Sequence, residues 1–535
     1  MSETPKKQSF LHGTALLAMA TAIVKIIGAL YKIPLNAIIG EQGFGYYSTA
    51  YEIYTVLLMI STAGLPVAMS RMIAQASSLN HYRQVRKIYT TARAIFLTLG
   101  LVGAALMTLF CKQLAQFQEQ PDAWAAIGAL GPCCFLICLM STYRGFFQGQ
   151  GNMLPTSISQ VLEAITKLVV GIAAALLVVF YTHNVSLAAG AAIMGVTISC
   201  LVSSFYLNHC FRKAYKEMPQ SSEEVSSGKD IAKGLLSIAI PITIGSAGLQ
   251  LLTVLETKIY MTQLLKTLTQ DIADTQKGIY SMALTIFNMP CAFITPITIS
   301  IIPAITSQLT LGNLTAAKAT EESAARISAL ISMPCAFGLA LLAQPVTQLL
   351  GGYSGEKLML ATQLMSVLGV CIIFNSMVLL TNAIMQAHGH EKLPVVNMFV
   401  GGFIKLVAVF ILTGNPVIGI VGTPIGSLLC YLSITVLNLF TMRRVLPQPP
   451  AIVKHMLRAF LAAALMGVCA WAAWKGTMAL LGTDLGKLEI LISCAVPIAV
   501  GVVIYAFAAI KLRAITREDC LLLPKGEKIA NLLHL

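Results

Sequence analysis

The chain has 535 residues, of which 56% are hydrophobic and only 11% are charged, and its formal net charge is +14. A soluble domain carries about 25% charged residues, so the composition excludes an ordinary soluble protein and indicates a polytopic membrane protein. The basic residues are dispersed between apolar stretches, which is typical of membrane topology, and we expect no nucleic-acid partner.

A helix needs about 20 mostly apolar residues to cross a bilayer. Fourteen stretches meet this criterion, so we expect an all-α integral membrane protein with about 14 transmembrane helices. The first carries Lys25 and lacks a small-residue cleavage site, which favours a span over a signal peptide. The spans lie at about residues 11–33, 48–70, 94–111, 124–147, 157–181, 186–210, 235–264, 279–303, 327–350, 358–386, 394–413, 417–441, 457–481 and 489–511.

The basic residues between the spans predict an orientation. With the N-terminus in the cytoplasm, 25 of the 36 lysines and arginines fall in cytoplasmic segments and six, Lys277 among them, in outer loops. The other five lie inside spans. Because lysine and arginine are enriched on the cytoplasmic side of membranes, we expect both termini to be cytoplasmic.

The sequence contains a weak internal repeat. GYYS (45–48) lies near the start of the second span, and GIYS (278–281) lies near the start of the eighth. The connection after the fourth span, FFQGQGNMLP (146–155), is matched after the tenth by IMQAHGHEKLP (384–394), and Lys167 and Lys405 follow at nearly the same offset. Two six-helix units of the same orientation place the repeat axis along the membrane normal, with a substrate site between them.

We therefore expect two pseudo-symmetric lobes and two additional helices. The predicted parts are an N-lobe at 1–215, a cytoplasmic linker at 216–234, a C-lobe at 235–445, and two further spans with a cytoplasmic tail at 446–535.

Charged residues inside the spans are the candidate site. Inserting one costs about 2.5 kcal/mol or more, so ion pairs or a polar cavity must offset the cost. The lysines are Lys25, Lys32, Lys167, Lys258 and Lys405; the nearby carboxylates are Glu52, Glu163 and Glu256; Arg71 and Arg144 lie at the cytoplasmic ends of two spans. Since the lysines outnumber the carboxylates, we predict a cationic cavity that binds an anionic phosphate or diphosphate headgroup through these ten residues.

Helical spacing leaves alternatives open for some of these residues. Glu163 and Lys167 stand at i and i+4 in the order that favours an ion pair, so this lysine is either tied to the glutamate or part of the site. Glu256 and Lys258 point about 200° apart and cannot simply neutralise each other. Lys32 lies near a helix end and could extend to the interface.

The sequence contains no recognisable catalytic constellation. GxxxxGK[ST], HExxH and GxSxG are absent. His388 and His390 are two residues apart but have no third ligand nearby, and the cysteines lie mostly in apolar stretches. We expect a protein that is not an enzyme and has no metal or cofactor.

Three segments resemble a known family. They are KIIGALYKIPLNAIIGEQGFGYYSTAYEIY (25–54), AGLPVAMSRMIA (63–74) and FFQGQGNMLPTSISQVLEAITKL (146–168). The chain resembles the SpoVB-like polysaccharide biosynthesis proteins of Gram-positive bacteria, in the multidrug/oligosaccharidyl-lipid/polysaccharide exporter superfamily that includes the MurJ lipid II flippases. The resemblance implies two six-helix lobes, alternating access, flipping of undecaprenyl-diphosphate-linked precursors, and an apolar groove for the lipid tail formed by the last two helices.

The resemblance also bears on individual cations. Arginines of the first, second and eighth helices line the cavity of MurJ proteins, and Lys25 matches the first of them. The next matches Tyr31, or Lys32 after a shift of one residue. The arginines of the second and eighth helices have no counterpart in this chain, so the set of cations is rearranged.

Three functions remain for comparison. The first is a flippase that moves a lipid-linked diphosphate oligosaccharide, lipid II in particular or another polysaccharide unit, across the bacterial plasma membrane by alternating access. It would act in cell-wall (peptidoglycan) biosynthesis, cell shape or sporulation, as a monomer, driven by membrane potential or by Na⁺ or H⁺. The second is a multidrug antiporter, for which twelve spans and an acidic cavity are expected. The third is a membrane glycosyltransferase, which needs an acidic catalytic loop that we do not find.

Overall fold

The computed structural model describes residues 10–482 and 486–514, and every regular element in these ranges is a helix. Thirteen of the helices are long and apolar enough to cross a membrane. The expected all-α membrane fold is therefore confirmed.

The first of these thirteen helical segments holds two of the predicted spans. Helix α1 (Phe10–Met59) continues through the π-helical turn η1 (Ile60–Gly64) into α2 (Leu65–Ser78), but Gly40 inside α1 has φ +69° and ψ 177°. The rings of Tyr31 and Tyr47 are 6.1 Å apart, whereas sixteen residues of straight helix span about 24 Å. The chain therefore reverses at Gly40, because a left-handed φ there costs glycine little, and no long loop separates the first two spans.

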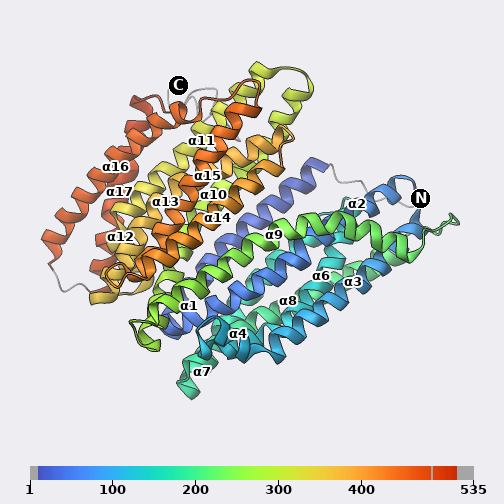
Figure 1. The fold of residues 1–535 in the computed structure, drawn as a ribbon, viewed down its shortest axis with the longest axis horizontal. Coiled ribbons are helices and arrows are strands. Elements are labelled where there is room, and N and C mark those ends of the chain that lie inside the picture. Colours follow the sequence, from blue (N-terminus) through green and yellow to red (C-terminus); the bar gives the residue numbers. More distant parts are fainter. Residues whose placement is uncertain (1–9, 483–485, 515–535) are drawn as a thin grey trace. The chain divides into compact units, whose positions relative to one another are not determined.

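The structure divides into two compact units, Met1–Gly278 and Ile279–Leu535. In the first, the long helices coloured from blue to green run roughly parallel to one another (Figure 1). After α1, η1 and α2, its elements are α3 (Tyr82–Leu109), α4 (Cys111–Phe117), η2 (Pro121–Ala123), α5 (Trp124–Ala129), α6 (Gly131–Gly149), α7 (Leu154–Thr182), α8 (Val185–Glu217) and α9 (Gly228–Leu264). Helix α10 (Gln270–Thr310) begins in this unit.

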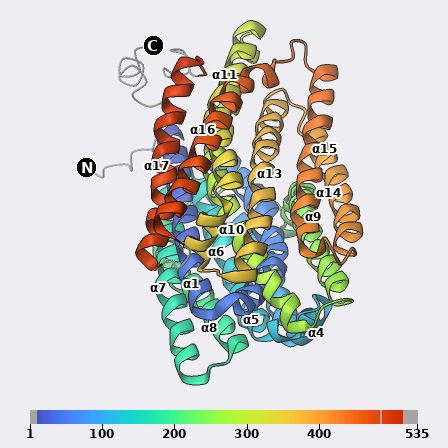
Figure 2. The ribbon, with the colours of Figure 1, turned by 90° about the vertical axis from the view of Figure 1, so that its left-hand side faces the viewer.

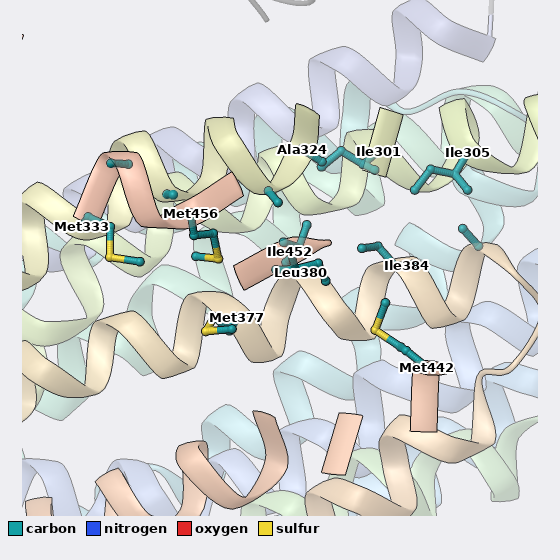
Figure 3. Close-up of a cluster of buried hydrophobic side chains, with 14 of the residues drawn as sticks. Ile301, Ile305, Ala324, Met333, Met377, Leu380, Ile384, Met442, Ile452 and Met456 are labelled. Carbon is teal, nitrogen blue, oxygen red and sulfur yellow. The ribbon is translucent and has the colours of Figure 1, made fainter. Parts of the chain in front are cut away.

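The second unit contains the rest of α10 and seven more α-helices, whose long members also run side by side (Figure 2). They are α11 (Leu314–Leu341), α12 (Ala343–Gly351), α13 (Gly355–Ala387), α14 (Lys392–Thr413), α15 (Gly422–Val445), α16 (Ile452–Leu481) and α17 (Lys487–Lys511), with the short η3 (Gly419–Val421) before α15. Its core is rich in methionine: Met333, Met377, Met442 and Met456 come from four different helices (Figure 3). Methionine fills irregular gaps because its side chain is unbranched and flexible.

The connections between helices reveal the repeat more clearly than the sequence does. The turn after α6 contains Gly151 at φ +75°, and its N–H bonds 151→148 and 152→147 recur as 389→386 and 390→385 in the turn after α13, where Gly389 has φ +79°. This is the Schellman pattern, which closes a helix with a left-handed residue. Three further pairs of left-handed residues match in order: Asn80 with Gly312, Glu119 with Gly352, and His183 with Gly419. The two copies of a six-helix unit are thus visible in their turns.

The boundary between the two compact units, after Gly278, does not coincide with the boundary between the two copies of the repeat. Helix α9 and the first turns of α10 open the second copy of the repeat, yet they belong to the first compact unit. The predicted lobe boundaries at 215 and 235 follow the repeat. They remain a prediction, namely that the two copies of the repeat move as two bodies.

Candidate functional site

A buried ion pair lies inside the first unit. The Nζ of Lys277 lies 3.2 and 3.3 Å from the two carboxylate oxygens of Glu52, and the Lys277 side chain is fully buried. The Thr257 hydroxyl donates to the same carboxylate at 2.7 Å. Removing one partner of such a pair leaves an uncompensated charge and costs about 3–5 kcal/mol. The prediction that Lys277 lies in an outer loop is therefore wrong, because α10 begins seven residues earlier.

A second pair of charged side chains, Lys32 and Lys167, lies near the tyrosines of α1, and Lys167 faces two of their rings. The Nζ of Lys167 lies 5.5 Å from the ring centre of Tyr31 and 5.8 Å from that of Tyr51. Lys32 lies within electrostatic reach of Lys167 and Glu52. Neither lysine forms an ion pair with another residue of the described chain. The electron-rich ring faces attract a cation, so the tyrosines support Lys167 without neutralising its charge.

The tyrosines form a stripe along the second half of α1. Tyr47, Tyr51 and Tyr54 stand at i, i+4 and i+7, and their consecutive ring centres are 5.8 and 5.5 Å apart. Residues at this spacing share one face of a helix. The stripe therefore lines one wall of the charged interior.

Glu163 takes a different partner from the one its spacing suggests. Its carboxylate lies 3.0 Å from the Nη2 of Arg144, whose Nε also donates to the Ser159 hydroxyl at 3.1 Å. Lys167 stays within electrostatic reach of Glu163 but outside ion-pair distance. Arg144 reaches the glutamate from α6, so the tie links two helices and leaves Lys167 for other contacts.

A network of polar side chains surrounds Asp274 near the start of α10. The fully buried Asp274 carboxylate accepts hydrogen bonds from Tyr46 at 3.1 Å, Gln120 at 2.8 Å and Gln270 at 3.0 Å. The backbone of α10 lies close to that of α1 here, and a Cβ added to Gly278 would collide with the Glu41 carbonyl oxygen. The first turns of α10 are thus fixed against the second half of α1.

Lys258 pairs with a glutamate from a turn. Its Nζ lies 2.5 Å from the carboxylate of Glu119, and the Glu119 carbonyl accepts from Gln270 at 2.8 Å. Glu119 has φ +56°, a left-handed conformation that is uncommon for residues other than glycine, asparagine and aspartate. The matching position in the repeat is Gly352. A side chain kept at such a position is a reason to expect a role for it.

Several of the predicted site residues are thus brought together in the first unit, and others are not. Those that form the charged interior are Lys32, Glu52, Arg144, Glu163, Lys167, Glu256 and Lys258. Lys25 and Arg71 are exposed, and Lys405 is half-buried in the second unit near Cys371.

The predicted excess of lysines over carboxylates in the interior has to be corrected. Sequence reasoning missed Glu119, Asp274 and Lys277, and with them the charges of the interior nearly balance. The sequence does contain a signal for two of them. Asp274, Lys277 and Ser281 stand at i, i+3 and i+7, a spacing that places polar side chains on one face of a helix. Within the charged interior of the described first unit, the positive charge that remains without an ion pair is concentrated at Lys32 and Lys167.

An apolar groove of about 480 Å³ lies in the second unit. Helices α10, α11, α12, α16 and α17 all contribute to its wall, with residues such as Met289, Leu342, Met466 and Val502. The last two helices were expected to line such a groove. The groove can hold a hydrocarbon chain, because its lining offers almost no polar atoms.

Together, the fold and the charged interior define a multi-pass membrane protein of the transporter type, built from two six-helix repeats and two further helices. The chain belongs to the family of polysaccharide biosynthesis proteins, whose model matches residues 10–308. It is similar to the stage V sporulation protein B of Bacillus subtilis (strain 168), with 25% identity over 84% of this chain and 87% of that protein. It is also similar to the lipid II flippase MurJ of the same organism, with 25% identity over 74% of this chain and 76% of the flippase.

Solved structures show the same fold. A lipid II flippase MurJ in an inward closed conformation matches with a TM-score of 0.67 and 13% identity, over 93% of this chain and 99% of that one. An inward-facing multidrug resistance transporter of the MATE family matches with a TM-score of 0.64 and 15% identity, over 82% and 95%. The resemblance inferred from the sequence is confirmed. The fold alone does not separate the flippase from the multidrug transporter.

Proposed function

We propose that this protein is a flippase that moves an undecaprenyl-diphosphate-linked cell-wall precursor, lipid II in particular, from the inner to the outer leaflet by alternating access. The similarity to a relative named as a lipid II flippase supports this proposal. So does the expected position of the substrate site at the midplane of a repeat-built transporter.

The observation that carries the proposal is a pair of lysines, Lys32 and Lys167, that form no ion pair with any residue the structure describes. Both lie inside predicted spans, where a charge without an ion pair is costly; Lys167 faces two tyrosine rings, and Lys32 lies within electrostatic reach of Lys167. A diphosphate brings negative charges that lysines can bind as point charges. Lys25 lies one heptad before Lys32 on α1 and would extend the path that the headgroup follows.

The other predicted site residues then have positioning roles. Arg144 and Glu163 tie α6 to α7, and Lys258 ties α9 to the turn at Glu119. Glu52 and Glu256 surround Lys277. Arg71 would attract the headgroup at the cytoplasmic mouth, and Lys405 would contribute the matching cation of the second repeat.

The apolar groove of the second unit fits the polyprenyl tail. Its volume of about 480 Å³ and its apolar lining provide room for several isoprene units. Because a hydrocarbon tail cannot cross a polar interior favourably, the tail would slide along this groove while the headgroup passes the lysines.

One observation favours a second candidate, an ion-coupled multidrug antiporter. Asp274 is buried and accepts from three neutral side chains, with no lysine or arginine at ion-pair distance within the described residues. Such a carboxylate could take up H⁺ or Na⁺. We assign it instead to ion coupling in the flippase, because the cationic pair at Lys32 and Lys167 would repel a cationic drug.

The remaining properties follow from the same proposal. The protein would act as a monomer in the bacterial plasma membrane, with both termini in the cytoplasm. Its role would lie in peptidoglycan biosynthesis during growth or sporulation.

Depletion in cells tests the proposal. An undecaprenyl-diphosphate-linked precursor should accumulate in the inner leaflet when the protein is depleted, and the chemical identity of this precursor names the substrate. Expression of the wild type should reverse the accumulation, whereas Lys167→Met should not. Lys475→Met is the matched control, because Lys475 also lies over two aromatic rings, 4.9 and 5.8 Å from their centres, but at an exposed position of α16. Depletion without any accumulation would refute the proposal.

A further inference from the structure

A second cationic cavity lies at the other end of the first unit, away from Glu119 and Asp274. It has a volume of about 450 Å³ and forms where the segment 218–227 crosses the start of α3. Arg83, Arg86 and Lys87 line one side, and Ser226 and Ser227 line the other. Three cations and no carboxylate therefore face this cavity.

Hydrogen bonds fix the segment that closes the cavity. The backbone N–H of Gln84 donates to the Glu223 carboxylate at 2.9 Å, and the side-chain oxygen of Gln84 accepts from the Ser226 N–H at 2.9 Å. The Nη2 of Arg86 donates to the Met218 carbonyl at 2.9 Å. Both walls are thus held in place by contacts that do not use the side chains of Arg83 or Lys87.

The cationic side chains of this cavity have N–H groups that are available to bind a ligand. Arg83 and Lys87 are exposed and form no ion pair with another described residue. Arg86 stacks over the Tyr215 ring at 5.1 Å, and its buried Nε has no hydrogen-bond partner in the described part of the chain. Two carboxylates of the neighbouring segment have partners of their own: Glu223 accepts from the Gln84 N–H through Oε1, and Asp230 accepts from the Ser227 hydroxyl at 2.7 Å.

We propose that this cavity is a binding site for a phosphate-bearing anion, separate from the path of the precursor. Arginine pairs with phosphate oxygens through parallel N–H bonds, and lysine binds them as a point charge. The first residue of α9 adds to the site, because a Cβ on Gly228 would lie 3.8 Å from Cε of Lys87. A helix N-terminus carries a partial positive charge that favours anions.

The anion has two possible sources with the same chemistry. The cavity lies at the end of a membrane span, where clusters of lysine and arginine attract anionic phospholipid headgroups. A soluble phosphate monoester offers the same group from the cytoplasm. In either case the bound anion would hold the linker and the start of α9 against α3, so that its occupancy would regulate the movement of the linker.

Binding measurements on the purified full chain in neutral detergent test this site. Glycerol phosphate is titrated by calorimetry, and phosphatidylglycerol is compared with phosphatidylcholine by native mass spectrometry. The double variant Arg83→Gln/Lys87→Gln removes two cations of the cavity, and both are exposed, so folding is preserved. The control Arg212→Gln/Lys213→Gln removes the same charge from exposed positions of α8 outside the cavity.

The proposal predicts at least tenfold weaker binding in the cavity variant and less than a twofold change in the control. Binding of phosphatidylglycerol alone identifies a lipid headgroup, and binding of glycerol phosphate identifies a soluble ligand. Equal affinity in the wild type and the cavity variant, or equal loss in both variants, would overturn the proposal, since the second result means only general attraction to positive charge.

Discussion

The Glu52–Lys277 pair supplies the sharpest test of how the interior is held together. Lys277→Met leaves Glu52 with the Thr257 hydroxyl as its remaining close partner, and Glu52→Leu leaves a fully buried ammonium. Each single change should cost about 3–5 kcal/mol, as expected for half of a buried ion pair. The double change replaces the pair by apolar groups and leaves only Thr257 without its acceptor, which costs about 1–3 kcal/mol.

The two single changes should therefore be far from additive, with a coupling energy of at least about 3 kcal/mol. Buried thiols such as Cys133 and Cys200 report unfolding when they become accessible to a thiol-reactive dye. Unfolding of large proteins is often irreversible, so the rate of dye reaction at fixed temperature is the suitable measure. Lys266→Met, at an exposed lysine nearby, serves as the control and should change stability by less than about 0.5 kcal/mol. Additive effects in the double variant would show that the contact contributes little.

Three further perturbations have defined outcomes. Gly278→Ala should lower the thermal stability strongly, because the added Cβ would collide with the Glu41 carbonyl oxygen; a melting temperature equal to that of the wild type would contradict this close approach of α10 to α1. Glu119→Gly should be more stable than Glu119→Ala by about 1 kcal/mol, because both lose the ion pair with Lys258 but only alanine keeps the left-handed strain; equal melting temperatures would argue against a strained turn. Desolvation raises the pKa of Glu223, but the backbone N–H groups of Gln84, Glu223 and Arg83 and the charge of His81 lower it more, to a net value below 4.5. A depressed carboxyl pKa means that the stabilisation is present at neutral pH and lost in acid, as the pH falls through the lowered pKa. Hydrogen exchange should therefore find the Gln84 N–H protected at neutral pH and released in acid, and Glu223→Ala, which removes the acceptor, should lose the protection already at neutral pH.

Local patterns were sufficient to predict the spans and the repeat. The length of an apolar stretch is a local property, and the turns at Gly151 and Gly389 close their helices with the same nearby hydrogen bonds. The predicted spans 11–33 and 48–70 left a long connection between them, whereas the chain reverses at Gly40 alone. Nothing in the neighbouring residues shows that a single glycine makes the whole change of direction.

The pairing of charges was harder to predict because it depends on contacts between helices. Glu163 had a suitable lysine four residues away, yet it binds an arginine nineteen residues away on another helix. Lys277 and Asp274 were assigned to a loop, since the apolar stretch of α10 begins only after them. Their burial comes from the close approach of α10 to α1, which no count of hydrophobic residues can show.

Reconstitution tests the central claim most directly. The purified protein is placed in vesicles that carry a fluorescent undecaprenyl-diphosphate oligosaccharide, and the fraction accessible from outside is measured over time. We predict exchange of the labelled lipid between the leaflets with the wild type and with Lys475→Met, and at least tenfold slower exchange with Lys32→Met/Lys167→Met. Exchange no faster than in empty vesicles, with uptake of a cationic drug driven by an ion gradient in the same preparation, would contradict the flippase and favour the antiporter.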